Sequence, residues 1–260
     1  MTRLDEAHVA MMQDEDNDAP RLKFYSLLAD TELFLMLDAE PVGDHISPRL
    51  FDLDDGPVVL AFDLEERLSD FVGGPAPYAA LPGRVVAGQL AGQGVGLGLN
   101  IGAAPSAIIL PASVMDWLAG TLATRPDEVA DTPQGFSYPW GIPAAVTDQL
   151  LQKLGANPGL AEAVLLAEVV YAQGRRGHIL AVLGAEIDAQ AALAGAISEA
   201  LVFSGLDMAE MDVTFLAPDD PRAQTIAEVA LRLDLPKPGP DVRPDRIAPG
   251  FDPQKPPRLR

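Results

Sequence analysis

The residues most suggestive of chemistry are five glycines in the segment GQGVGLGLNIG, between Gly92 and Gly102. Backbone amides in a glycine-rich turn can bind phosphate. A dinucleotide-binding turn, however, needs glycines at positions i, i+2 and i+5, and a P-loop needs Gly-Lys followed by Ser or Thr. Neither pattern is present. Four of the glycines recur at every second residue, which places them on one face of a β-strand. We therefore predict a strand whose bare face lets another backbone or an aromatic ring approach closely, followed by a turn at Asn100–Gly102.

The carboxylates and histidines form no complete metal or catalytic motif. Asp14, Asp16 and Asp18 have the alternating start of a calcium-binding loop, but Ala19 and Tyr25 occupy the positions that need glycine and glutamate. The three histidines form no HxxxH or HExxH pattern, and no serine lies in a GxSxG turn. The chain has no cysteine, which excludes thiolate catalysis, disulfides and cysteine-ligated metals. We predict no catalytic residue, no metal site and no cofactor, and we expect that the protein is not an enzyme.

The composition limits the classes of partner. Lys and Arg number 18 against 38 Asp and Glu, a formal net charge of −20. Binding to nucleic acid or to an anionic membrane surface is therefore not expected. No window reaches the roughly 18 uninterrupted apolar residues of a membrane span, and the first ten residues do not resemble a secretory signal, so we expect a soluble cytoplasmic protein. A basic protein partner and simple solubility both remain explanations of the charge. The identity of the partner and the oligomeric state stay open.

Three residues are candidates for contact with an unknown protein partner. Tyr138 and Trp140 lie in the segment SYPWGIP, where aromatic side chains among prolines can anchor a partner. The same two rings can instead hold the segment against the protein's own domains. Asn100 is the third candidate, because it lies at the turn that is expected to end the glycine-rich strand.

The elements that would position these residues can be read from turn and capping signals. We predict a helix from Thr2 to Met12, with Thr2 and Asp5 at capping-box spacing, and a second capping box at Asp63 and Glu66. Periodicity and turn residues predict the other elements of the first half. They are a strand at 33–37, a hairpin around the turn DDGP, a helix at 81–92, a strand at 106–110 and a helix from Pro111 to Leu122.

The second half has a clearer pattern. A helix is expected at 143–154, then two strands, AVLLAEVVYA and HILAVLGA, joined in a hairpin by QGRRG. A helix capped by Asp188, the strand DVTFLA and a last helix from Asp220 to Leu233 follow. This order predicts a small α+β domain with helices on one face of its sheet.

The fold expected for the whole chain is α+β. It has two small domains, at 1–123 and 143–235, each a mixed or antiparallel sheet covered by helices. The polar, Pro- and Gly-rich stretch 124–142 is expected to be a linker. Residues 236–260 hold eight prolines and a net charge of +3, which predicts a disordered, polyproline-like tail or a basic arm that docks on an acidic surface.

Several segments resemble a known family. FYSLLADTELFLMLDAEP, GPVVLAFDLEERLSDFVG and LPGRVVAGQLAGQGVGLGLNIGAAPSAIILPASVMDWL are similar to the N-terminal domain of SseB-like bacterial proteins, named for enhanced serine sensitivity. LAEAVLLAEVV, HILAVLGA and MDVTFLAP are similar to the C-terminal domain of the same family. The resemblance covers about residues 20–235. Family members often have Asn-Pro-Gly where this chain has Asn100–Gly102, so the resemblance does not extend to that turn.

The resemblance implies an accessory cytoplasmic protein without a catalytic site, with a link to serine or amino-acid homeostasis. Together with the missing catalytic motif, it favours a non-enzymatic binding or regulatory protein. Two alternatives stay open. One is an immunity-type inhibitor of a basic toxin. The other is a small-molecule binder or enzyme with a cleft between the domains, near Asn100 and the segment that holds Tyr138 and Trp140.

Overall fold

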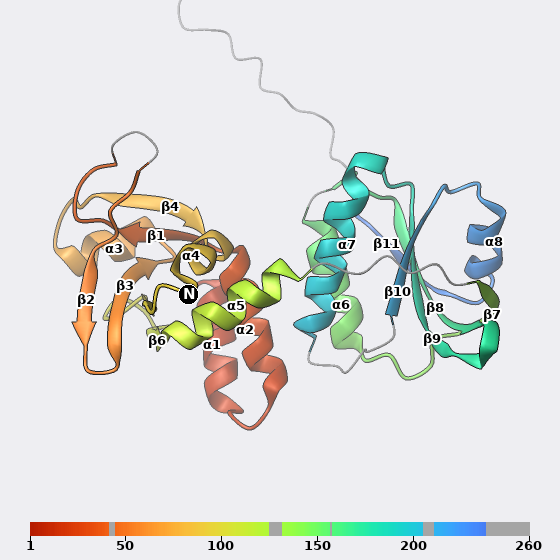
Figure 1. Ribbon diagram of the computed structural model, residues 1–260, viewed down its shortest axis with the longest axis horizontal. Helices are drawn as coiled ribbons and strands as arrows, with labels where there is room; N and C mark the ends of the chain where they lie inside the picture. The colour runs from red at the N-terminus through yellow and green to blue at the C-terminus, as the bar shows by residue number, and fades with distance from the viewer. Residues whose placement is uncertain (42–44, 125–131, 157, 205–210, 238–260) are drawn as a thin grey trace, which may run out of the picture.

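The computed structural model describes residues 1–41, 45–124, 132–156, 158–204 and 211–237. Figure 1 shows two units side by side, each built on its own sheet. Both sheets are mixed, and helices pack on them, so the predicted α+β class is confirmed. The predicted tail comprises residues 236–260, of which 238–260 lie outside the described residues.

The first unit holds five helices and a six-stranded sheet among the described residues. The strands are arranged in the order β4-β1-β3-β5-β6, and β2 joins β3. Among the described strands of this sheet, β3 and β5 are the one parallel pair. The elements are α1 (Arg3–Gln13), α2 (Asp18–Asp30), β1 (Glu32–Met36), β2 (Leu50–Leu53), β3 (Gly56–Phe62), α3 (Glu65–Val72), β4 (Tyr78–Pro82), α4 (Gly83–Leu90), β5 (Gly96–Leu99), β6 (Ile108–Leu110) and α5 (Ala112–Ala123).

The two faces of this first sheet are covered unequally. Buried residues of α1, α2, α4 and α5 form one large core with the sheet, represented by Leu4, Phe24, Val86 and Met115. On the opposite side, Leu68 of α3 is buried in a smaller cluster with residues of β1 and β3. We call this second side the outer face.

The second unit has a five-stranded sheet in the order β10-β9-β8-β11, with β7 also paired to β8. α6 and α7 cover one face of the sheet, and α8 lies on the other. Its elements are β7 (Pro133–Ser137), α6 (Ala144–Gly155), β8 (Ala163–Tyr171), the short 3-10 helix η1 (Ala172–Gly174), β9 (Arg176–Leu183), α7 (Ile187–Val202), β10 (Met211–Leu216), α8 (Pro221–Ala227) and β11 (Leu231–Asp234).

Three predictions for the second unit are wrong. Residues 133–137, expected in the linker, pair with β8 as β7. The last helix ends at Ala227, and 231–234 form β11 instead, because Leu231 and Leu233 alternate with polar residues and pair with β8. Helices also lie on both faces of the sheet, since α8 packs opposite α6 and α7.

The glycine-rich strand is shorter than predicted. Only Gly96–Leu99 forms β5, because Gly92 and Gly94 have φ values of +73° and +69° that belong to a turn. The expected close approach is confirmed at Gly96, where an added Cβ would lie 2.5 Å from the carbonyl oxygen of Leu110.

Of the two predicted capping boxes, one is confirmed and one is wrong. The capping box of Thr2 and Asp5 is confirmed at the start of α1. That of Asp63 and Glu66 is wrong, because α3 begins after Leu64 without a side-chain cap. The Asp63 carboxylate instead accepts hydrogen bonds from Thr2 and Arg67.

Side chains of the second unit reach into the first. Phe203, at the end of α7, is fully buried in the core of the first unit and meets Trp117 edge-on at 6.2 Å between ring centroids. Beside it, Glu199 pairs with Arg84 at 2.9 Å and with Lys153 at 3.2 Å. Arg84 and Lys153 also pair with Asp30, so the four charges alternate in sign across the boundary between the units.

Candidate functional site

Asn100 is not at a partner surface. Its side chain is fully buried, with a backbone φ of +50°. Its Oδ1 accepts a hydrogen bond of 3.1 Å from the backbone amide of Asp63, and its Nδ2 donates one of 2.8 Å to Ser106. The prediction of a partner contact at Asn100 is therefore corrected, because a buried amide with both ends bonded holds the turn in place.

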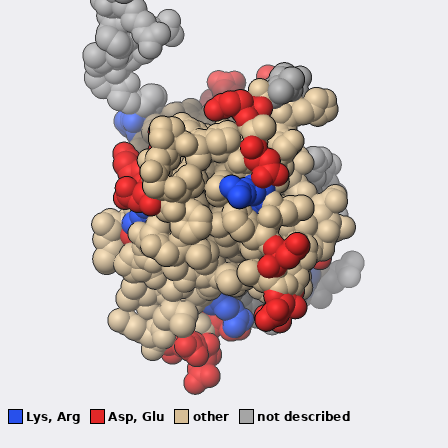
Figure 2. Space-filling model, turned by 90° about the vertical axis from the view of Figure 1, so that its left-hand side faces the viewer, with Lys and Arg blue, Asp and Glu red and all other residues tan. Residues whose placement is uncertain are grey.

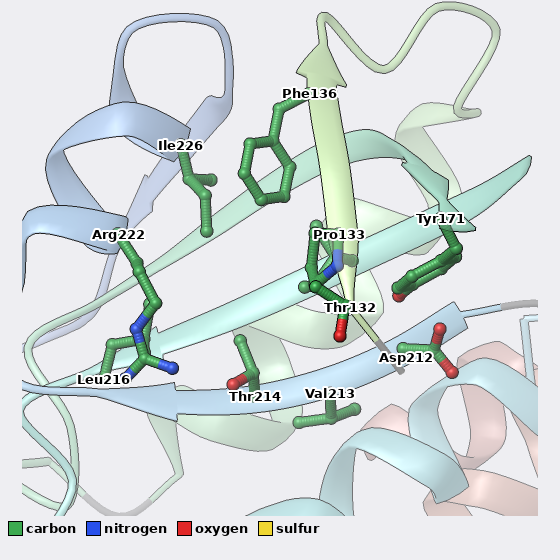
Figure 3. A pocket seen from close by; sticks show the side chains of 11 residues that line it. Thr132, Pro133, Phe136, Tyr171, Asp212, Val213, Thr214, Leu216, Arg222 and Ile226 are labelled. Atoms are coloured by element: carbon green, nitrogen blue, oxygen red, sulfur yellow. The ribbon is translucent and has the colours of Figure 1, made fainter. Parts of the chain in front are cut away.

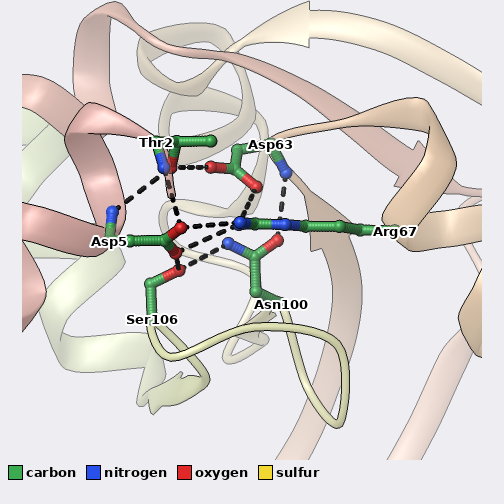
Figure 4. A network of polar contacts seen from close by, with 6 residues as sticks. All are labelled: Thr2, Asp5, Asp63, Arg67, Asn100 and Ser106. Atoms are coloured by element: carbon green, nitrogen blue, oxygen red, sulfur yellow. Dashed lines mark hydrogen bonds and ion pairs between the residues drawn. The ribbon is translucent and has the colours of Figure 1, made fainter.

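Asn100 belongs to a larger buried polar network, shown in Figure 4. Arg67 of α3 donates to Asp5 at 2.6 Å and to Asp63 at 2.7 Å. Burial raises the pKa of Asp5, but hydrogen bonds from Arg67, Ser106 and the Thr2 amide outweigh it and hold that pKa far below the usual range. The network ties the N-terminus, α3 and the end of β5 together, which is a structural role.

Tyr138 and Trp140 lie at the surface just after β7. They are 42% and 81% exposed, and their ring centroids are 4.7 Å apart. The rings therefore contact each other and remain accessible to a partner. Their partner-binding role stays a prediction.

The alternative of an inter-domain cleft can be compared with a groove of about 440 Å³ between the units. It lies between α1 and α2 on one side and α6 on the other, and Gln149 of α6 is among its lining residues. Asn100, Tyr138 and Trp140 do not line it. This groove therefore lies at a different place from the cleft that was predicted near those three residues.

The outer face of the first sheet is rich in aromatic residues that the short α3 covers only in part. Phe34, Phe51 and Tyr78 remain half-buried around the buried cluster. Phe34 and Tyr78 meet edge-on at 5.4 Å between centroids. Phe71 and Ile109 are 40% and 52% exposed; Ile109 points to this face because its neighbours on β6 pack on the other side.

Carboxylates surround this aromatic surface. Burial and the nearby carboxylates of Glu65, Glu32 and Glu40 raise the pKa of Tyr78. Figure 2 views the molecule from the side of the first unit and shows acidic side chains around a largely uncharged surface, with few basic ones. One of the basic side chains of this region, Arg49, lies over the ring of Phe51 at 5.4 Å.

A second candidate site is a groove of about 460 Å³ in the second unit, which Figure 3 shows. β7 and α8 form its walls, and strands β9 and β10 form its floor. The apolar lining residues are Pro133, Phe136, Tyr171, Ile179, Val213, Leu216 and Ile226. The polar lining residues are Thr132, Asp212, Thr214 and Arg222.

Charged groups at the rim of this groove are paired. Arg175 binds Asp212 at 2.9 Å and lies over the Tyr171 ring at 3.9 Å. Burial and a hydrogen bond with Asp212 raise the pKa of Tyr171 far above its usual value. At the other end, Arg222 binds Asp220 at 2.7 Å.

Neither the outer face nor the groove was predicted from the sequence. A weak signal for the groove was present in β10, where Asp212 and Thr214 alternate with apolar residues. This alternation indicates a strand with one polar face, but the position of β7 opposite that face was not expected. For the outer face, no local signal distinguishes Phe34 or Phe51 from fully buried strand residues.

Within the described residues, His, Asp and Glu side chains do not gather in a group of three or more that could hold a metal ion. In the same part of the chain, no helix combines the length and the apolarity needed to cross a membrane.

Comparison with known proteins gives one match. Residues 4–115 match the family model of the SseB protein N-terminal domain. This range holds the outer face and most of the core of the first unit. Neither the curated proteins nor the solved structures give a match. The resemblance of 143–235 to the C-terminal domain of that family stays a prediction.

Proposed function

We propose that this chain, whose residues 4–115 match the model of the SseB protein N-terminal domain, is a non-enzymatic cytoplasmic protein that binds a basic protein partner. The partner contacts the part of the outer face that α3 leaves open. One observation carries the proposal: an aromatic sheet surface that is half-buried, uncapped by further helices among the described residues, and rimmed by carboxylates.

The aromatic side chains supply the apolar contact. Phe34, Phe51 and Tyr78 present large rings that a partner can cover at a low cost in side-chain entropy. Arg49 stacks on Phe51. Burial of apolar area contributes about 25 cal/mol per Å², so covering these rings would stabilise a complex.

The charges select the partner. Residues 1–70 carry 18 acidic and five basic side chains, a net charge of −13. Glu32, Glu40 and Glu65 lie around Tyr78 at the rim. Carboxylates at an interface rim attract Lys- and Arg-rich surfaces, repel acidic ones and accelerate association.

The pairing of charges supports a binding role over catalysis. In the groove of the second unit, Asp212 and Arg222 each have an ion-pair partner, and the buried network around Asp5 is linked by hydrogen bonds. None of these groups is arranged as a nucleophile with a base and an orienting residue. The link to amino-acid homeostasis rests on the family resemblance.

The first experiment locates the contact. A photo-crosslinking phenylalanine analogue replaces Phe51 on the outer face, and in the control it replaces Ile187, which is 83% exposed on the second unit. After irradiation in native extract, we expect the Phe51 position to crosslink to one defined protein through a Lys- or Arg-rich segment. Equal products from both positions would contradict the proposal.

The second experiment measures affinity for the partner so identified. The variant with Glu32, Glu40 and Glu65 changed to Gln should bind about tenfold more weakly and with a smaller salt dependence, because each rim charge contributes roughly 0.2–1 kcal/mol. The control changes Glu15, Glu186 and Glu228 to Gln, which removes the same charge elsewhere. Equal weakening by both variants would show that net charge, and not the outer face, governs binding. A partner that is a toxin inhibited on binding would narrow the role to that of an immunity protein.

A further inference from the structure

The groove of the second unit differs in polarity from one end to the other. Its middle is apolar, with Phe136 on the β7 wall, Ile226 on the α8 wall and Ile179 on the floor. Figure 3 shows the Phe136 and Ile226 side chains facing each other across the groove. A cavity of about 460 Å³ has the size of a small-molecule site, for which about 300–1,000 Å³ is usual.

One end of the groove is neutralised by the protein itself. Asp212 pairs with Arg175 at 2.9 Å and takes part in a hydrogen bond with Tyr171. The guanidinium of Arg175 also lies over the Tyr171 ring. The charged groups of this end are therefore engaged with one another and with Tyr171.

The other end keeps unused donors. Arg222 uses Nε and Nη2 to bind Asp220, and its Nη1 makes no hydrogen bond to any residue that the structure describes. The Thr214 hydroxyl likewise has no hydrogen-bond partner within the described residues. Figure 3 shows the Arg222 guanidinium and the Thr214 hydroxyl at the same end of the groove, next to the apolar middle.

We propose that this groove binds an apolar carboxylic acid. The carboxylate accepts hydrogen bonds from Arg222 Nη1 and the Thr214 hydroxyl, and the apolar part lies between Phe136 and Ile226 over Ile179. A guanidinium suits a planar carboxylate well, since charge-assisted hydrogen bonds to it are short and strong. Asp220, already on the same guanidinium, disfavours an anion with more than one charge. This site is independent of the protein contact proposed for the outer face.

The test uses three probes of one shape. 4-Phenylbutanoate, 4-phenylbutanamide and 4-phenylbutylamine share a phenylpropyl group and end in a carboxylate, a neutral amide and an ammonium group, and each is titrated into the full-length ¹⁵N-labelled protein by NMR. We expect the carboxylate to shift amide signals of β7, β10 and α8, with a dissociation constant about tenfold lower than that of the amide or the amine.

Two variants and a control locate the donors. Arg222→Gln and Thr214→Val should each remove most of the preference for the carboxylate and leave binding of the amide unchanged. Arg232→Gln is the matched control, because Arg232 pairs with Asp234 through Nε on β11, and neither residue lines the groove. Unchanged circular dichroism spectra exclude loss of the fold.

The titrations have one result that supports the site and three that would overturn it. A carboxylate preference that Arg222→Gln abolishes and Arg232→Gln retains supports the site. Equal binding of the three probes, absence of shifts in the groove, or equal effects of the two arginine variants would overturn it.

Discussion

Among the described residues, each sheet has two or more helices on one face and one helix on the other, but the areas left uncovered differ. On the first sheet, the area beside α3 is an open aromatic surface with a rim of carboxylates. On the second, β7 stands opposite α8, so the corresponding area is narrowed to a groove whose charges are nearly balanced. The difference shows that the position of one short strand, β7, decides whether the area beside a small helix is an open surface or a groove.

The two short helices are also held differently. Arg67 of α3 is 13% exposed and lies between two buried carboxylates, Asp5 and Asp63. Arg222 of α8 is 72% exposed and pairs with Asp220, which lies two residues before it in the chain. The outer face is therefore positioned by a buried ionic network, whereas the groove wall is positioned mainly by the packing of Ala223 and Ile226.

The largest expected effect comes from removing that buried network. Arg67→Ala should lower the free energy of unfolding by about 3–5 kcal/mol, because it leaves two buried carboxylates without their cation. Arg222→Ala should lower it by less than about 1 kcal/mol, because its ion pair is exposed. Urea unfolding followed by circular dichroism measures both. Similar losses for the two variants would remove the contrast between α3 and α8.

A glycine in each sheet tests how closely the backbones approach. Gly96→Ala should destabilise the protein by about 1–3 kcal/mol, because the new methyl group would meet the Leu110 carbonyl. Gly135→Ala in β7 should be neutral or stabilising by up to about 1 kcal/mol, because no atom lies within 4 Å of its added Cβ. Thermal unfolding of the pair gives the comparison. A neutral Gly96→Ala would mean that the first sheet can spread to admit the methyl group.

Low pH should reduce the stability of the first unit more than that of the second. The pKa of Asp5 is lowered in the folded protein from an ordinary value of 3.8, so the stability it contributes is fully present above about pH 4 and is lost as the pH falls below that value. Asp5→Asn should lower stability at pH 7 and flatten its dependence on pH below 4. Asp220→Asn is the comparison: hydrogen bonds with Arg222 lower the pKa of Asp220 as well, but Arg222 is exposed, so this variant should flatten the acid profile less than Asp5→Asn. The measurement is the urea midpoint of each variant between pH 2.5 and pH 7. Equal flattening of the pH profile by the two variants would contradict the prediction.

The smallest expected effect on stability is at Trp140. Because its side chain is 81% exposed, Trp140→Ala should change the free energy of unfolding by less than about 0.5 kcal/mol. A larger loss would favour the alternative that the aromatic pair holds the segment against its own domain. A stable variant that binds the partner more weakly would instead extend the contact surface from the outer face to Tyr138 and Trp140.

Local rules predicted much of the fold. The capping box of Thr2 and Asp5, the hairpin of β8 and β9 and the helix after Pro111 follow from neighbouring residues, so the sequence alone was sufficient. β7 and β11 were missed because a strand of four or five residues is stabilised by its partner, and both pair with residues of β8 that are 31 or more positions away along the chain. Propensity within such a short segment is a weak signal.

The candidate sites were harder to predict for the same reason. Asn100 was noticed, but its burial depends on Ser106 and on Asp63, and Asp63 in turn is held by Arg67. Phe136, Thr214 and Arg222 come from three separate elements and line the same groove. Their separation along the chain gives no sign that they lie close together. Sites that assemble from distant segments become visible only when the strand order is known.

Phe203 has a consequence for how the two surfaces work together. Because this ring is buried in the other unit's core, pulling the units apart would open a cavity there and expose a large aromatic group to water. α3 and α8 lie toward opposite ends of the molecule in Figure 1. Separating the two units would therefore cost stability, and the two proposed sites lie toward opposite ends of a molecule whose units share one core.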